Sequence, residues 1–142
     1  MPLEDRRVSH RVKLAALWAS LMLCYIYCDY FELYQPGKLQ SMLAGRLGPL
    51  GPATQGSLLA ASVLLAVPAL MIGLCTLLPV RICRAANVAL GVIYTLVMAA
   101  VLPGTWYYFK MFGAIEIGIS ASIAWLALKW PAANVSPASD DA

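Results

Sequence analysis

Of the 142 residues in the chain, 61% are hydrophobic and only 12% are charged, and the mean hydropathy is +0.75. A chain of this length normally forms one domain, and a soluble domain could not bury so much apolar surface. The formal net charge of +3 comes from scattered basic residues, a distribution that sets membrane topology and does not form a nucleic-acid surface. We therefore expect a protein surrounded by membrane lipid and exclude nucleic acid as a partner.

After a polar, basic cytoplasmic leader at residues 1–13, the chain has four hydrophobic runs, each long enough to cross about 30 Å of hydrocarbon as a helix. The first run is too long for a cleaved signal peptide and no clear cleavage site follows it. The sequence therefore predicts an all-α integral membrane four-helix bundle at residues 14–130, followed by a disordered cytoplasmic tail at 131–142. The predicted spans are residues 14–34, 56–78, 85–102 and 106–130.

The long connection between the first two spans reads QPGKLQSMLAGRLGPLGPATQG. Its apolar residues Leu39, Met42, Leu43 and Leu47 recur at helical spacing, and polar residues occupy much of the remaining circumference. This pattern predicts a short amphipathic surface helix over the outer mouth of the bundle. The alternative is an irregular loop whose leucines pack on the helix ends.

Within the spans, Pro68 removes a backbone hydrogen bond and predicts a kink, and the sequence LPGT at residues 102–105 predicts a tight turn between antiparallel neighbours. Small residues at four-residue intervals indicate the faces that pack, because helices in lipid associate by close contact. Any of these faces could instead bind a second copy of the protein. The stripes are Ala16, Ser20, Cys24 and Cys28, then Asn87, Gly91, Thr95 and Ala99, then Ala114, Gly118 and Ser122.

Basic residues gather on one side of the predicted spans, and by the positive-inside rule this side is the cytoplasm. The first connection has only Lys38 and Arg46, and the third has no basic residue. We therefore predict that both termini are cytoplasmic and that the first connection is outside. The residues on the cytoplasmic side are Arg6, Arg7, Arg11, Lys13, Arg81, Arg84 and Lys129.

The candidate site consists of acids at membrane depth, where an ionisable group costs about 2.5–3.5 kcal/mol. A rise of about 1.5 Å per residue places Asp29 and Glu116 in the same outer half of the bilayer, with Glu32 near the interface. Tyr25 shares a helical face with Asp29 and Glu32, so its phenol could reach the same cavity. We predict a ligand or proton site made from these residues and Asn87, in which one carboxyl holds a proton because two close acids cannot both stay ionised.

Two other interpretations of these acids stay open. They could hydrogen-bond tyrosines, Asn87 or backbone carbonyls and hold the helices in register, or they could bind a divalent cation, for which few oxygen ligands are visible. The sole histidine, His10, lies in the leader, so haem or a histidine-ligated metal has no ligand within the spans. No Cys-x-x-Cys pair exists for thiol redox chemistry. We therefore expect no cofactor and no metal.

Four separated blocks resemble a family of small bacterial four-helix membrane proteins known only as a domain of unknown function. They are YIYCDYFELYQPGKLQSMLAG, TQGSLLAASVLLAVPALMI, the segment from Asn87 to Gly91 and YYFKMFGAIEIGISASIAWLALKW. The resemblance covers about residues 14–131 and implies the architecture but no activity. The chain departs from it at Cys75, where the family has a polar residue. The shape is also similar to DoxX-type membrane proteins, at fold level only. The matching residues are Tyr25, Asp29, Pro36, Gly37, Gly45, Gln55, Pro68, Asn87, Glu116 and Trp125.

From these features we expect a protein of the bacterial inner membrane that binds or moves a small apolar or weakly basic ligand at the intramembrane carboxylates, coupled to protonation. A transporter of this length would need a homodimer. Two other classes stay open. One is a non-catalytic accessory or structural subunit of a larger membrane complex. The other is a membrane enzyme acting on a lipid or quinone, with Asp29 or Glu116 as general acid or base but no complete catalytic constellation.

Overall fold

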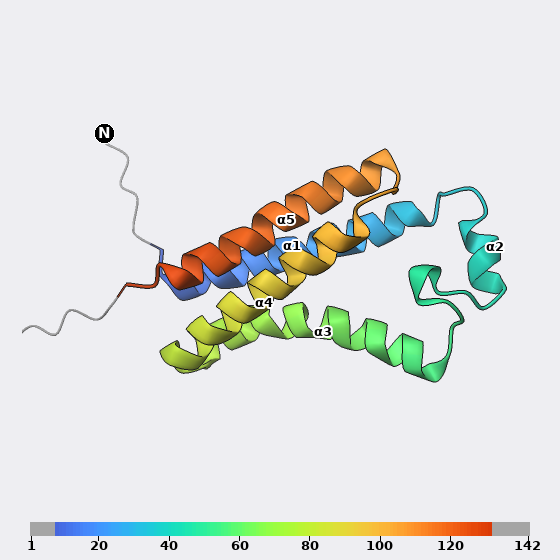
Figure 1. Cartoon of the computed structure of the whole chain (residues 1–142). Coiled ribbons are helices and arrows are strands. Elements are labelled where there is room, and N and C mark those ends of the chain that lie inside the picture. Colours follow the sequence, from blue (N-terminus) through green and yellow to red (C-terminus); the bar gives the residue numbers. More distant parts are fainter. Residues whose placement is uncertain (1–7, 132–142) are drawn as a thin grey trace, which may run out of the picture.

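The computed structural model describes residues 8–131, and within this range the chain is all-helical, as predicted (Figure 1). Residues 1–7 of the predicted leader and 132–142 of the predicted tail lie outside the described residues, whereas residues 10–13 of the leader form the start of the first helix. Each of the four long helices is long and apolar enough to cross a membrane, so the chain has the architecture of a multi-pass membrane protein. The long helices are α1 (His10–Glu32), α3 (Gln55–Leu77), α4 (Val80–Val101) and α5 (Tyr107–Leu128).

The four long helices form an incomplete ring. α1 packs against both α3 and α5, and α5 packs against α4, whereas α3 and α4 make few contacts with each other. Figure 1 shows α3 and α4 meeting at the turn between them and diverging toward the opposite end of the bundle. The bundle therefore has a packed half near the turn and an open half at the other end.

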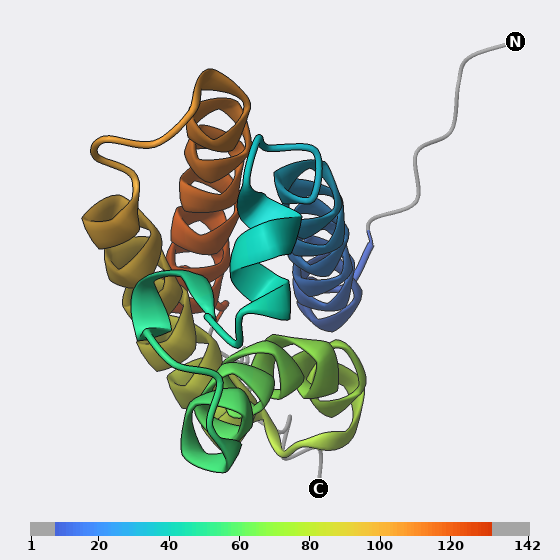
Figure 2. The same ribbon diagram turned by 90° about the vertical axis from the view of Figure 1, so that its right-hand side faces the viewer.

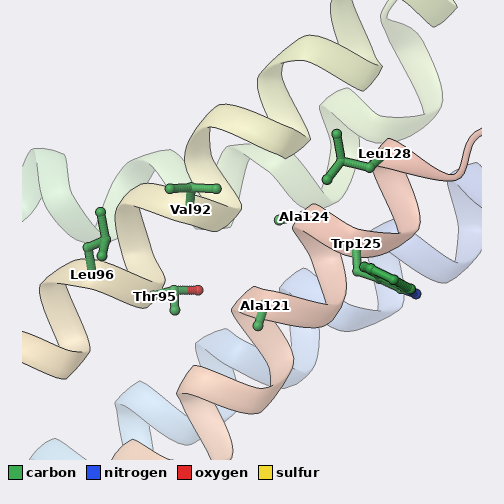
Figure 3. Close-up of a pocket in the computed structure, with 7 residues that line it drawn as sticks. All are labelled: Val92, Thr95, Leu96, Ala121, Ala124, Trp125 and Leu128. Carbon is green, nitrogen blue, oxygen red and sulfur yellow. The ribbon is translucent and has the colours of Figure 1, made fainter.

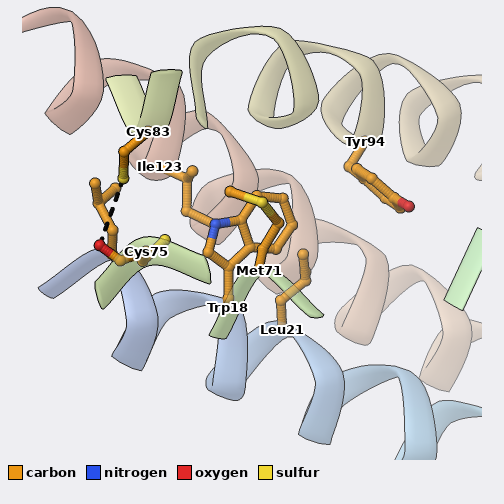
Figure 4. Close-up of a cluster of buried hydrophobic side chains, with 8 residues drawn as sticks. Trp18, Leu21, Met71, Cys75, Cys83, Tyr94 and Ile123 are labelled. Atoms are coloured by element: carbon orange, nitrogen blue, oxygen red, sulfur yellow. Dashed lines mark hydrogen bonds between the residues drawn. The ribbon is translucent and has the colours of Figure 1, made fainter. Parts of the chain in front are cut away.

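The packed half holds the hydrophobic core, in which side chains of all four long helices meet around Trp18 (Figure 4). The Trp18 indole donates a 2.7 Å hydrogen bond to Asn87 Oδ1, and Asn87 Nδ2 donates a 2.7 Å bond to the Cys83 carbonyl. Asn87 is completely buried, and these bonds satisfy its amide. Other members of the core are Leu14, Leu21, Met71, Cys75, Tyr94 and Ile123.

Two arginines close the packed end. Arg11 Nη1 donates hydrogen bonds of 2.9 and 2.8 Å to the carbonyls of Thr76 and Leu78 at the end of α3. Arg84 binds the last carbonyls of α5 in the same way, with bonds of 3.2 Å. The final carbonyls of a helix have no partner within the helix and carry partial negative charge. These arginines therefore cap two helices. From the sequence they were expected only to hold this end of the bundle on the cytoplasmic side.

The open end carries the short helix α2 (Lys38–Leu43) and the 3₁₀ helix η1 (Gly48–Leu50). The predicted helix in the first connection is therefore present, although it is short. Gly37 starts it with a φ of +79°, a left-handed conformation that favours glycine. Figure 2, viewed from this end, shows α2 lying across the mouth of the bundle. Its apolar residues Leu39, Met42 and Leu43 are exposed.

Small residues pack α4 against α5, as the stripe through Gly91 predicts. A Cβ atom added at Gly91 would lie 2.8 Å from the Ala124 nitrogen and 2.9 Å from the Ser120 oxygen. Both atoms belong to the α5 backbone, so the two helices can approach this closely only because position 91 has no side chain. The hydroxyls of Thr95 and Ser120 also hydrogen-bond across the interface at 2.8 Å.

The predicted stripe on the last span is wrong for packing within the chain. Ala114, Gly118 and Ser122 are exposed, as are Ala16 and Ser20 of the α1 stripe. The bundle interior and lipid are both apolar, so small residues alone do not mark which face turns inward. The buried residues of α5 are instead Gly113, Glu116, Ser120, Ile123, Ala124 and Ala127.

We expect Gly91→Ala to destabilise the protein by about 1–3 kcal/mol, because the added methyl group meets backbone atoms that cannot move aside. Gly118→Ala is the matched control, since a Cβ there meets nothing within 4 Å. Unfolding in a detergent titration, followed by circular dichroism, measures both variants. Equal stability of the two would contradict the close α4–α5 contact.

Candidate functional site

A cavity of about 740 Å³ occupies the open half, with walls from all four long helices. Most of its lining is apolar. Its acidic and phenolic lining residues are Tyr25, Asp29, Glu32, Tyr94 and Glu116.

Four of the five site residues proposed from the sequence therefore line one cavity, while Asn87 does not. Asn87 lies in the packed half, where its amide is bonded to Trp18 and Cys83. Cys75, the position at which the chain departs from the family pattern, lies beside it, with its sulfur 3.5 Å from Asn87 Oδ1. The polar contacts of Asn87 join α4 to α1 and α3, and Asn87 is not part of the cavity lining.

Glu116 is the most deeply buried acid of the cavity. Its side chain is 1% exposed, and neither carboxyl oxygen has a hydrogen-bond partner among residues 8–131. Glu116 lies on the inward face of α5 because Gly113 and Ser120, one turn before and after it, are both buried there. Buried polar groups almost always have partners, and an unpaired carboxylate is costly. The carboxyl of Glu116 therefore requires a proton or an external partner.

The other two acids lie closer to the mouth. Asp29 is exposed and lines the cavity one turn below the end of α1. Glu32 forms an ion pair with Lys38, the first residue of α2. Beside it, Gln35 Nε2 donates a 2.5 Å hydrogen bond to the Tyr108 hydroxyl, which joins the first connection to α5. Glu32 is thus part of a polar rim that is already paired, whereas Asp29 and Glu116 are available within the cavity.

Tyr94 marks the inner limit of the cavity, and the sequence analysis missed it. Its hydroxyl donates a 2.6 Å hydrogen bond to the carbonyl of Leu64. Pro68 lies four residues later in α3 and has no N–H, so it cannot donate the helical bond that this carbonyl would otherwise accept. A phenol from α4 supplies the missing donor. The available signal was the position of Tyr94, two turns after Asn87 on the buried face of α4.

A second hollow lies on the outer surface between α4 and α5 (Figure 3). It measures about 230 Å³, and Thr95 is its only hydroxyl-bearing lining residue, so it offers no acid–base chemistry. Trp125 borders it and is exposed, with the Lys129 ammonium 4.2 Å from its ring centroid. This pairing suits an anchor at the membrane interface.

Within residues 8–131, no three His, Cys, Asp or Glu side chains come together as a metal-binding group. All four cysteines are free thiols, and Cys28 lines the cavity. The chemistry that this lining offers is therefore that of a proton or a positively charged organic group next to carboxyls, within apolar walls.

A family of proteins of unknown function, DUF6326, matches residues 3–136, nearly the whole chain. The chain belongs to DUF6326. This confirms the resemblance found in the sequence. No curated protein and no solved structure matches the chain, and the likeness of this DUF6326 protein to DoxX-type proteins stays a prediction.

We expect Tyr94→Phe to lower the free energy of unfolding by about 1–2 kcal/mol, because it leaves the Leu64 carbonyl without a donor. In a Pro68→Ala background the same change should cost much less, since the substitution restores a backbone N–H that can bond the Leu64 carbonyl. Tyr27→Phe is the control, because its side chain is exposed. A double-mutant cycle of detergent unfolding measures the coupling, and purely additive effects would refute this role of Tyr94.

Proposed function

We propose that this DUF6326 protein binds a small, largely apolar and weakly basic ligand in its cavity and that Glu116 transfers its proton to this ligand. The supporting observation is the buried carboxyl of Glu116, which has no hydrogen-bond partner within the described residues. A protonated amine would supply both the opposite charge and an N–H donor. The apolar walls suit the hydrocarbon part of such a ligand.

Proton transfer keeps the site electrically neutral. Without ligand, a proton on Glu116 removes the cost of an ionised group at membrane depth. With ligand bound, the carboxyl of Glu116 is ionised, and the positive charge of the ammonium group beside it offsets the cost of that ionised group. Asp29, nearer the mouth, is a second carboxyl of the same cavity, and the Tyr25 phenol can hydrogen-bond either acid.

Movement of the ligand across the membrane would need a second arrangement of the bundle. The half that contains Trp18 and Asn87 is fully packed, so a ligand in the cavity has no way out on that side. An exposed face with Gly118 at its centre leaves room for the second copy that a transporter of this size would need. Binding requires neither rearrangement nor dimer, and it is therefore the part of the proposal that the geometry supports best.

The competing classes have weaker support. An accessory subunit of a larger complex does not require an intramembrane acid beside a cavity. A membrane enzyme acting on a lipid or quinone would need a general acid or base that is hydrogen-bonded to a second catalytic side chain. Glu116 has no hydrogen-bonded partner within residues 8–131. Ligand binding accounts for both the cavity and the unpaired acid.

The proposed location is the bacterial inner membrane, with both termini in the cytoplasm. The packed end carries Arg11, Arg81, Arg84 and Lys129, which supports a cytoplasmic position for that end. The cavity mouth and α2 would then lie on the outer side.

Binding of octylamine to the protein in lipid nanodiscs tests the ligand class, with octanol as the uncharged probe of the same length. We expect Glu116→Gln to weaken octylamine binding about tenfold or more and to change octanol binding little, because the amide cannot pair with an ammonium group. Glu32→Gln is the matched control, since Glu32 is engaged by Lys38 at the rim. Calorimetry gives the affinities. Equal octylamine binding by wild type and Glu116→Gln would overturn the proposal.

Infrared difference spectra report the proton itself. Octylamine should remove the C=O band of a protonated carboxyl from the wild-type spectrum and produce carboxylate bands instead, because the acid gives its proton to the amine. The same difference should be absent in Glu116→Gln. Binding with no change in this band would mean that Glu116 does not transfer its proton to the ligand.

Cysteines placed at position 40 or position 9 of a cysteine-free protein test the orientation. A membrane-impermeant thiol reagent added to intact cells should label the variant Gln40→Cys and spare Ser9→Cys, because basic residues hold the N-terminal side in the cytoplasm. The reverse pattern would invert the topology.

A further inference from the structure

We infer that the ligand enters the cavity sideways from the bilayer, through an opening between α3 and α4, and is therefore a lipid-soluble amine that arrives in its neutral form. The identity of the ligand rests on the proposed function, whereas the opening rests on the geometry alone.

The first observation is the arrangement of α3 and α4. These two helices meet at their connecting turn, make few contacts elsewhere and diverge toward the end that carries α2 (Figures 1 and 2). The hydrogen bond from Tyr94 to Leu64 joins them at the inner limit of the cavity. Between this bond and the open end, α3 and α4 do not pack against each other, so the ring of helices is open on that side.

The second observation is that cavity-lining residues on the facing sides of α3 and α4 are also exposed. A side chain that both lines a cavity and is exposed marks where that cavity meets its surroundings. Because these residues belong to two helices that are long and apolar enough to cross a membrane, we place the opening against the hydrocarbon of the bilayer. Four of them have large apolar side chains, with exposed fractions from 37% to 44%: Leu64, Leu65, Val97 and Val101.

The route from water differs in chemistry, because Asp29 and Trp106 line the cavity near its outer mouth and are exposed there. At the outer mouth, Lys38 is paired with Glu32, and Gln35 is bonded to the Tyr108 hydroxyl at 2.5 Å. The ring of Phe31 packs near that of Tyr108, with 6.4 Å between centroids, and α2 lies across this end (Figure 2). A ligand coming from water would pass charged and polar groups, while the exposed lining residues that border the opening between α3 and α4 are apolar.

The chemistry of Glu116 matches an apolar entrance. A cation that crosses hydrocarbon pays a large desolvation cost, whereas a neutral amine does not. Inside the cavity, the protonated carboxyl of Glu116 gives its proton to the amine nitrogen, which leaves a carboxylate next to an ammonium group. The reactants and the products both have zero net charge, so no charge has to pass the opening.

Cys28 provides a test that needs no ligand, because its thiol lines the cavity. The protein in lipid nanodiscs is treated with a long-chain alkyl maleimide or with a negatively charged, water-soluble maleimide, and labelled peptides are measured by mass spectrometry. We expect Leu65→Trp, which narrows the opening, to slow modification of Cys28 by the alkyl maleimide about fivefold or more. The control Leu70→Trp should have no effect, since Leu70 is exposed on α3 but does not line the cavity.

Comparison at one thiol cancels the intrinsic reactivity of that thiol. The completely buried Cys75 and Cys83 of the packed half serve as internal references for intact folding. Labelling of Cys28 by the charged reagent as fast as by the lipid-soluble one, or no protection by Leu65→Trp, would overturn the lateral entrance. So would a Cys28 that neither reagent reaches.

The experiments distinguish a failure of the proposed ligand class from a failure of the lateral entrance. If octylamine does not bind but Leu65→Trp protects Cys28, the opening stands and the proposed ligand class is wrong. If octylamine binds with the behaviour expected of Glu116 while Cys28 is reached from water, the ligand proposal stands and the lateral entrance is wrong.

Discussion

The hydrogen bond between the Tyr94 hydroxyl and the Leu64 carbonyl is the constraint on which the rest of this structure depends. Pro68 deprives that carbonyl of its helical donor, and lipid has no water to replace it. The phenol that supplies the bond comes from α4, so the proline also ties α3 to α4 at one point. Toward the turn the bundle is packed, and toward the other end the two helices separate. One proline thereby fixes where the cavity begins.

The buried polar groups of the two halves differ in their hydrogen bonding. In the packed half, Asn87 uses its amide on Trp18 and Cys83, and Arg11 and Arg84 satisfy the carbonyls at the ends of α3 and α5. In the open half, Glu116 is equally buried and has no partner within the described residues. A polar group that serves only to hold helices together would be expected to bond one of them. Glu116 does not, which sets it apart from Asn87.

Features that depend on distance along a helix could be predicted from the sequence. Features that depend on direction around it could be predicted only in part, as for the packing face through Gly91. A fixed rise per residue was enough to place Asp29 and Glu116 at similar depth, and the structure puts both on one cavity. The inward face of α5 was misassigned because small residues occur on both sides of that helix. Tyr94 was missed because an aromatic residue in a span is ordinary until Leu64 is known to lie opposite its hydroxyl.

The unpaired acid and the apolar side of the cavity are linked by electrostatics. A carboxyl beside a wide aqueous mouth would be hydrated and would need no other partner. Glu116 is almost completely buried, and the break in the ring between α3 and α4 is bordered by leucine and valine side chains. Hydrocarbon cannot stabilise an ionised group, so the charge of Glu116 can appear only together with a positive charge beside it. In the function that we propose, the same apolar border would exclude ions and would make ligand binding and loss of the proton from Glu116 a single event.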